Sequence, residues 1–168
     1  MPLETARAEE VLKQSVYVET TIISYLTARP SRDMLHAAHQ QLTQEWWATR
    51  RADFDLYVSQ LVEQEASMGE KEMAHKRLEA IESLPRLDVH LKVVDLAELL
   101  IKSGTLPLNA TVDALHIATA TVHKMDYLLT WNCKHIANAE IYRKLAELCR
   151  AKGYQPPIIC TPEGLQGE

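Results

Sequence analysis

Short apolar strands alternate with helical segments along almost all of this 168-residue chain, and that alternation restricts the fold more than any other feature. Strands joined by helices run parallel, because each connection has to cross over the sheet. A parallel sheet is buried on both faces and therefore needs helices on each side. We expect an α/β protein, a three-layer α/β/α sandwich with a central, mainly parallel sheet of four to five strands.

Runs of β-branched and aromatic residues predict the strands, and apolar residues spaced three and four apart predict the helices. The first strand is expected near the middle of the sheet. The strands are expected over residues 15–18, 54–59, 91–94, 127–130 and 157–160. The helices are expected over 22–28 (capped by Thr20 or Thr21), 60–68, 71–84, 96–102, from the cap Asn109 to about 124, and 139–152. One more helix is expected after its cap Ser31, and its apolar stripe is Met34, Leu35, Ala38, Leu42, Trp46 and Trp47.

No linker interrupts the alternation, so we expect a polar lead-in over residues 1–14 and a single domain over 15–165. The N-terminus has no basic head followed by an apolar stretch, and no apolar run approaches the ~20 residues that span a bilayer, so neither a signal peptide nor a membrane segment is expected. Cys133, Cys149 and Cys160 are widely spaced, which is typical of reduced thiols in a cytoplasmic protein. The net charge of −5 gives no global attraction to nucleic acid, so a nucleic-acid role would need local basic patches or bound cations.

Polar side chains with oxygen atoms stand where strands end and helices begin. Glu19 follows the strand 15–18, Asn132 follows the strand 127–130, and Asp113 lies in the first turns of an apolar helix. Ligands of α/β proteins bind outside the carboxyl ends of the strands. Carboxylates crowded together there repel one another unless a cation neutralises them. This placement indicates a site for a hard cation such as Mg²⁺ or Mn²⁺.

Each of these residues also has a purely structural interpretation. Asp113 can interact with the dipole of its own helix, and Glu19 can bond the amides of the helix that follows it. Asn132 can serve as a turn residue. Glu65 can be a solvated helix residue, and Glu63 competes with it because both lie near the start of one helix, about 200° apart around it. The combination of all four favours the metal site.

Four segments in this order resemble the PIN domain family. They are Val-Tyr-Val-Glu19-Thr-Thr-Ile-Ile-Ser-Tyr-Leu, Glu65-x-x-x-Gly69, Asp113-Ala-Leu-His-Ile-Ala and Leu-Leu-Thr130-Trp131-Asn132, and the similarity extends to Ile158-Ile159-Cys160-Thr161-Pro162. The resemblance implies a PIN-like domain and a metal-dependent ribonuclease, since the family includes the toxins of bacterial toxin–antitoxin pairs.

The resemblance also implies a set of site residues. The four acidic positions of the family carry over to Glu19, Glu65, Asp113 and Asn132, which would be both catalytic and metal-binding, and would meet in one cleft. The hydroxyl that usually follows the first acid carries over to Thr20 or Thr21. Thr130 and His116 are further supporting candidates, and His116 is expected to pack beside Asp113 or to orient it. The chain departs from the family in two places, because the first acid is usually Asp and the fourth is often Asp.

These expectations give a function: a Mg²⁺- or Mn²⁺-dependent endoribonuclease that hydrolyses phosphodiester bonds, with RNA as substrate, an antitoxin protein as partner and a homodimeric state. Candidate RNA contacts are Lys134 and His135 next to Asn132, and Arg50 and Arg51 next to Trp46-Trp47. A zinc site at His36 and His39 is disfavoured, because no further Cys or His stands nearby in the sequence to complete it. The alternative function is a catalytically weak or inactive PIN-like module that binds RNA or a protein.

Overall fold

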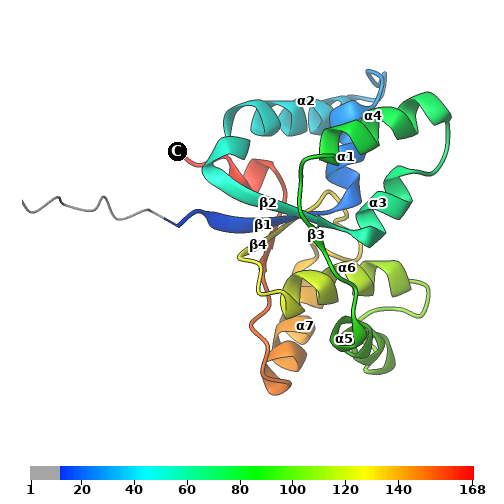
Figure 1. The fold of residues 1–168 in the computed structure, drawn as a ribbon. Coiled ribbons are helices and arrows are strands. Elements are labelled where there is room, and N and C mark those ends of the chain that lie inside the picture. The colour runs from blue at the N-terminus through cyan, green and yellow to red at the C-terminus, as the bar shows by residue number, and fades with distance from the viewer. Residues whose placement is uncertain (1–11) are drawn as a thin grey trace, which may run out of the picture.

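Five parallel strands form the central sheet of the computed structural model, which describes residues 12–168 (Figure 1). The strand order is β3-β2-β1-β4-β5, so the first strand lies at the centre of the sheet, as expected. The lead-in expected over residues 1–14 lies almost wholly outside the described residues. The strands are β1 (Gln14–Val18), β2 (Phe54–Ser59), β3 (Arg86–Leu87), β4 (Tyr127–Leu129) and β5 (Ile158–Cys160).

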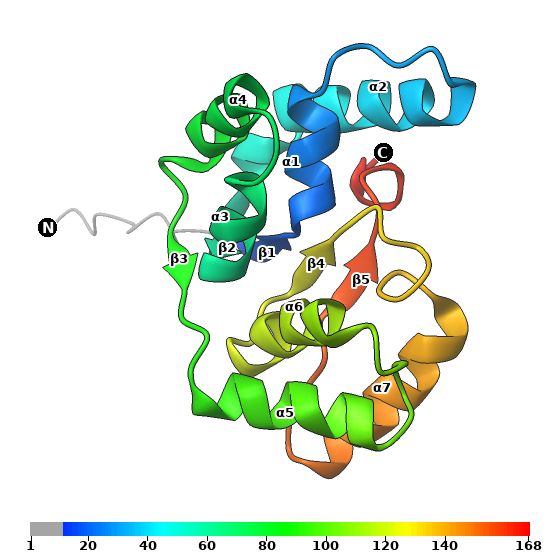
Figure 2. The same ribbon diagram turned by 90° about the vertical axis from the view of Figure 1, so that its right-hand side faces the viewer.

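Helices cover both faces of the sheet, which confirms the three-layer α/β/α sandwich (Figure 2). Four helices lie on one face: α1 (Thr20–Thr27), α2 (Met34–Thr49), α3 (Gln60–Ala66) and α4 (Lys71–Ile81). Three lie on the other: α5 (Leu91–Lys102), α6 (Thr111–Val122) and α7 (Ala139–Ala151). None of the helices in the described part of the chain is both long enough and apolar enough to cross a membrane.

The register between β1 and β4 positions the carboxyl edge of the sheet. Val18 is paired with Leu129, and the backbone N–H of Glu19 donates to the Leu129 carbonyl at 3.0 Å. Both strands are completely buried at this point, because helices cover the sheet on either side. The polar residues that follow the two strands therefore lie side by side at the carboxyl edge of the sheet.

The strand expected over 91–94 is wrong, because these residues form the first turn of α5. The third strand is instead the short pair Arg86–Leu87. Valine at positions 93 and 94 is typical of a strand, but Val93 is buried together with Leu96, Ala97 and Leu100. That spacing of three and four residues places all of them on one face of a helix, so the apolar period of the whole segment outweighs its local β-propensity.

The expected start of α2 is also wrong, and its expected apolar stripe is wrong in its first turn but right at Trp46, which is completely buried. Asp33 caps the helix by accepting the N–H of His36 at 2.9 Å, whereas Ser31 lies outside it. Met34 and Leu35 are 87% and 65% exposed. The buried face of α2 consists of Gln40, Thr43 and Trp46.

Two other expected caps differ. Glu19, and not Thr20 or Thr21, caps α1, and Ala110 begins α6 without a side-chain cap, although Asn109 was expected there. The bounds of the remaining helices and strands differ from those expected by at most three residues, except that α5 begins five residues early.

Candidate metal centre

The carboxyl edge of the sheet brings together side chains from four parts of the chain. Glu19 follows β1, and Thr130 to Asn132 follow β4. Glu65 lies on α3, the helix that follows β2, and Asp113 and His116 lie on α6. Parallel strands end at the same edge, and the helices that follow them begin there, so residues far apart in the sequence meet.

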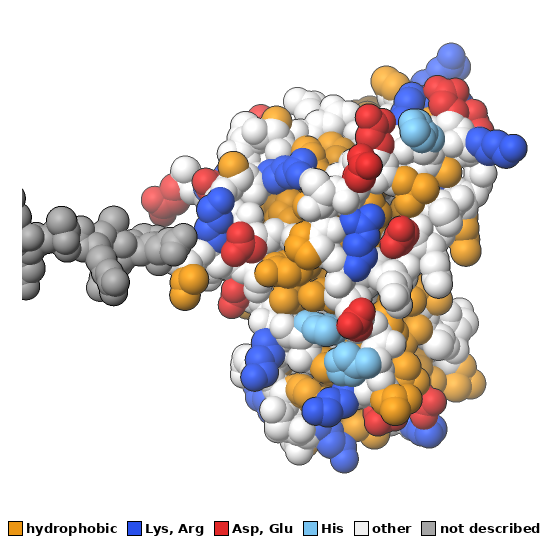
Figure 3. All heavy atoms as spheres, viewed as in Figure 1, with side chains coloured by type: hydrophobic (Ala, Val, Ile, Leu, Met, Phe, Trp, Pro, Cys, Tyr) orange, Lys and Arg blue, Asp and Glu red, His pale blue; other side chains and the backbone are white. Residues whose placement is uncertain are grey.

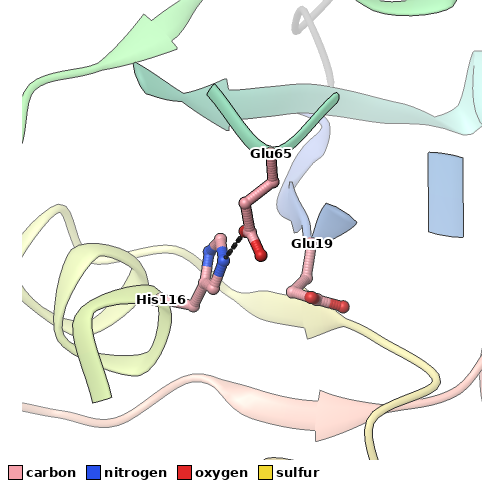
Figure 4. Close-up of side chains that lie close together, drawn as sticks. All are labelled: Glu19, Glu65 and His116. Carbon is pink, nitrogen blue, oxygen red and sulfur yellow. Dashed lines mark hydrogen bonds and ion pairs between the residues drawn. The ribbon is translucent and has the colours of Figure 1, made fainter. Parts of the chain in front are cut away.

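Glu19, Glu65 and His116 form the acidic cluster, which is defined by one potential ligand atom from each residue, all within 4.8 Å of one another (Figure 4). Glu19 is 3% exposed and His116 is 1% exposed, whereas Glu65 is half-buried. Figure 4 shows Glu65 and His116 pointing toward one another, with Glu19 beside them. A pair of carboxylates this close is costly to bury unless something compensates their charge.

One oxygen of Glu19 accepts three hydrogen bonds. Its Oε2 accepts from the Thr21 N–H at 3.1 Å, from Thr21 Oγ1 at 2.5 Å and from Thr130 Oγ1 at 2.8 Å. Its Oε1 accepts none from the described residues. The side chain is therefore fixed by one oxygen while the other keeps its lone pairs.

Glu65 shows the same asymmetry. Its Oε1 accepts from Thr20 Oγ1 at 2.8 Å and lies 2.5 Å from His116 Nε2, while its Oε2 accepts nothing from the part of the chain that the structure describes. Burial acts to raise the pKa of Glu65, but the His116 hydrogen bond and attraction, together with the Thr20 hydroxyl, outweigh it and hold the pKa below its ordinary value. Glu65 is thus ionised at neutral pH.

The ring of His116 bonds with Glu65 through Nε2, whereas the hydrogen-bond partners of Asp113 are Asn132 and His135. The Nδ1 atom of His116 lies 2.7 Å from the Tyr17 hydroxyl, which in turn lies 2.7 Å from Ser59 Oγ. Tyr17 is completely buried, and burial raises its pKa far above the ordinary value, so the phenol keeps its proton. A partner for Tyr17 could have been expected from the sequence, because a tyrosine in a fully buried strand needs a hydrogen-bond partner for its hydroxyl.

Asp113 and Asn132 form a second set with His135. Asp113 Oδ1 accepts from Asn132 Nδ2 at 3.0 Å, and its Oδ2 lies 2.8 Å from His135 Nδ1. Asn132 Oδ1 accepts the backbone N–H of His135 at 3.1 Å. Asn132 therefore holds Asp113 and the following turn, and Asp113 is not a member of the acidic cluster.

Thr130 joins the two sets. Its hydroxyl donates to Glu19 Oε2 and accepts the backbone N–H of Asn132 at 2.9 Å. Hydrogen bonds thus link Glu19, Asn132 and Asp113, while Glu65 lies beside Glu19 in the acidic cluster. The four residues form two groups and not a single cluster.

The structure separates Glu65 from its competitor Glu63. Glu63 is exposed and lies 3.5 Å from the Arg86 guanidinium, whereas Glu65 points into the acidic cluster. The two side chains leave α3 in different directions, as expected from their spacing of two residues.

The structure places Arg50 and Arg51 away from this edge. They immediately precede β2, at the amino-terminal edge of the sheet. Arg50 pairs with Asp53 at 3.0 Å, and Arg51 lies over the Trp47 ring at 4.5 Å. The face drawn in Figure 3 shows acidic and basic side chains interspersed with apolar ones, with no continuous basic patch. Of the four candidate RNA contacts, only Lys134 and His135 lie beside the acidic residues.

The donor set at this edge suits a hard divalent cation. No lysine or arginine among the described residues forms an ion pair with Glu19, Glu65 or Asp113; their only ion-pair partners there are His116 and His135. Glu19 and Glu65 each keep one oxygen that accepts no hydrogen bond from residues 12–168. Carboxylate oxygens are the ligands that Mg²⁺ and Mn²⁺ prefer, so the residues present fit such an ion.

The sequence of the chain matches no protein-family model and none of the curated proteins to which it was compared. Three solved structures nevertheless share its fold. VapBC2 from Rickettsia felis, crystallised with a DNA fragment from its promoter, is 18% identical and covers 88% of this chain and 98% of its own, with a TM-score of 0.50. A toxin–antitoxin complex from Klebsiella pneumoniae is 17% identical and covers 88% and 97%, with a TM-score of 0.56.

The third structure is VapC20 from Mycobacterium tuberculosis, described as a toxin that cleaves the sarcin–ricin loop. It is 16% identical, covers 71% of this chain and 92% of its own, and has a TM-score of 0.53. These likenesses show the fold. The chain has the fold of these three structures, an α/β/α sandwich of the kind expected from its resemblance to the PIN domain family.

Proposed function

We propose that this chain is a divalent-metal-dependent endoribonuclease and the toxin of a toxin–antitoxin pair. The observation that carries the proposal is the pair Glu19 and Glu65, each with one oxygen held by hydrogen bonds and one left without any, at the carboxyl edge of the sheet. A carboxylate pair without a lysine or arginine partner is expected where a cation binds.

Glu19 and Glu65 would hold a Mg²⁺ or Mn²⁺ ion, and Asp113 would act beside them. When bound, such an ion supplies Lewis-acid chemistry: it makes water a better nucleophile at neutral pH and stabilises the charge that develops on a phosphodiester. No nucleophilic side chain is required for this hydrolysis.

The surrounding residues orient the acids. Thr21 and Thr130 fix Glu19, while Asn132 and His135 fix both oxygens of Asp113. Lys134 is exposed two residues after Asn132, and its ammonium group would contact an RNA phosphate. A local contact of this kind is needed because the chain as a whole carries a net charge of −5.

The partner proposal follows from the structures that share the fold. Two of them are toxin–antitoxin assemblies. We infer an antitoxin protein as the natural partner of this chain, and a homodimer as its state in the absence of antitoxin.

The test is an RNA-cleavage assay of the full chain with Mn²⁺, with Mg²⁺ and with a chelator. The substrates would be an unstructured RNA and a set of stem-loops that includes the sarcin–ricin loop, because one protein with this fold is described as cleaving it. We expect cleavage that requires the metal. Cleavage undiminished by the chelator, or no cleavage of any RNA under conditions where Mn²⁺ binds, would contradict the proposal and favour a binding module.

A further inference from the structure

A buried chain of hydrogen bonds leads from the acidic cluster into the core of the sheet. It runs from Ser59 to Tyr17 at 2.7 Å, from Tyr17 to His116 Nδ1 at 2.7 Å, and from His116 Nε2 to Glu65 Oε1 at 2.5 Å. Ser59 and Tyr17 are completely buried and His116 is almost so. β2, β1 and α6 each contribute one of these three residues, so packed secondary structure holds the chain in place.

The direction of donation follows from the end of the chain. An ionised carboxylate only accepts, so His116 Nε2 carries a proton and donates to Glu65. In the singly protonated form of the ring, Nδ1 is bare, and it accepts from the Tyr17 hydroxyl. The Tyr17 oxygen is left to accept from Ser59. Every bond in the chain therefore donates toward Glu65, and such bonds strengthen one another in a buried setting.

A glutamate requires this support more than an aspartate does. Its side chain has one more rotatable bond, and fixing a long side chain costs conformational entropy. Glu65 is held at one oxygen only, by His116 and Thr20. Both ring nitrogens of His116 are already used, so the imidazole cannot bind a cation through Nε2 without giving up its bond to Glu65.

We propose that His116 and Tyr17 are positioning residues: Tyr17 fixes the Nε2-protonated tautomer of His116, and His116 holds Glu65 so that Oε2 stays free to bind a cation. This inference rests on the proposed metal site. It assigns His116 a role beside the ion, although its position in the acidic cluster would also suit a ligand.

The first test needs no metal. Nitrogen–proton NMR correlation spectra of the metal-free protein report which ring nitrogen of His116 is protonated. We expect a proton on Nε2 and a bare Nδ1 in the wild type, and loss of this single tautomer in Tyr17→Phe. A bare Nε2 in the wild type, or a Tyr17→Phe spectrum unchanged at His116, would overturn the proposal.

The second test is the Mn²⁺ affinity of the full chain by titration calorimetry. Tyr17→Phe removes a hydroxyl that lies two hydrogen bonds away from Glu65, and we expect it to weaken Mn²⁺ binding roughly threefold to tenfold, below the 10–100-fold typical of a direct partner of a ligand. The matched control is Tyr57→Phe, on the neighbouring strand in register with Tyr17, whose hydroxyl makes no hydrogen bond to the described residues. Equal affinities for the two variants would count against positioning.

His116 itself is tested with a pair of variants. His116→Ala should weaken Mn²⁺ binding about 10–100-fold, and His116→Gln should recover part of the loss, because its amide is able to donate to Glu65. If His116→Gln binds Mn²⁺ as weakly as His116→Ala while both melt at the wild-type temperature, the donor role is wrong. A wild type that binds no Mn²⁺ would instead reject the proposed metal site, and the NMR spectra would still decide the tautomer.

Discussion

Thr130 and Glu19 are joined across the centre of the sheet: the Thr130 hydroxyl donates to Glu19 Oε2 at 2.8 Å and accepts the N–H of Asn132. Replacing Thr130 with Val keeps the shape but removes both bonds. We expect a loss of about 1–3 kcal/mol in the free energy of unfolding, because the Asn132 N–H is left without its partner. Thermal unfolding measures this loss. Thr49→Val is the control, since its hydroxyl bonds only within α2, and it should stay within about 0.5 kcal/mol of wild type.

Asp113 is predicted to be the acid whose replacement reduces RNA cleavage most. Its side chain is short, lies on a helix and is held by hydrogen bonds at both oxygens. Asp113→Asn keeps the shape and removes the charge. We expect RNA cleavage to fall at least about 100-fold, which corresponds to about 2.7 kcal/mol of lost transition-state stabilisation. The melting temperature in metal-free buffer should not fall. Asp95→Asn, an exposed change on α5, should cleave like wild type; equal rates for Asp113→Asn would refute the assignment.

Mn²⁺ should stabilise the folded chain against heat. At 100 times the dissociation constant a ligand adds about 2.7 kcal/mol, which corresponds to a rise of roughly 5–10 °C in the melting temperature of a chain this size. Glu65→Gln should abolish most of the rise, and Glu63→Gln should keep all of it. The opposite result would make Glu63 the second acid.

The stability contributed by Glu65 should depend on pH in metal-free buffer. Its pKa is held below the ordinary value near 4.5 by His116 and Thr20, against the effect of burial. A carboxyl group with a lowered folded-state pKa contributes stability above its unfolded-state pKa and loses it as the pH falls through the folded-state value. The difference in melting temperature between wild type and Glu65→Gln should therefore narrow below about pH 5. A difference that is constant from pH 7 to pH 3 would contradict this.

The three thiols should differ sharply in reactivity. Cys133 is exposed, whereas burial raises the pKa of Cys149 and of Cys160 to about 11. At pH 8 only about one buried thiol in a thousand is ionised, and the thiolate is the reactive form. Mass spectrometry after brief alkylation should find one adduct, at Cys133. Rapid modification of Cys149 in the native protein would show that the packing beneath α7 is wrong.

The fold was predictable because its main signal is repeated along the whole chain. Each strand is followed by a polar residue and most helices have an apolar period, so an error in one segment does not alter the topology. The error over 91–94 arose because β-branched residues begin a helix there. Whether such a segment is a strand or a helix depends on what Val93 packs against in the folded chain. The apolar stripe predicted for α2 was wrong in part for a similar reason, since the polar residues Gln40 and Thr43 lie on its buried face.

The candidate site was predictable in its residues but not in its connections. Glu19, Glu65, Asp113 and Asn132 all lie at the carboxyl edge of the sheet, where strands end and helices begin. Which of them touch depends on the direction of each side chain, and the sequence carries little information about that. The contact of His116 with Glu65, and of His135 with Asp113, depends on how α3, α6 and the turn after β4 pack together.

Glu19 begins α1 with the same carboxylate that would bind the cation, one oxygen serving each purpose. Folding and chemistry therefore cannot be varied independently at this position. In a library that samples every amino acid at residue 19, yield of folded protein and nuclease activity would fall together, whereas at Asp113 activity would fall while yield persists. A selection that scores only survival of the producing cell would confuse the two positions, and a parallel measurement of protein abundance would separate them.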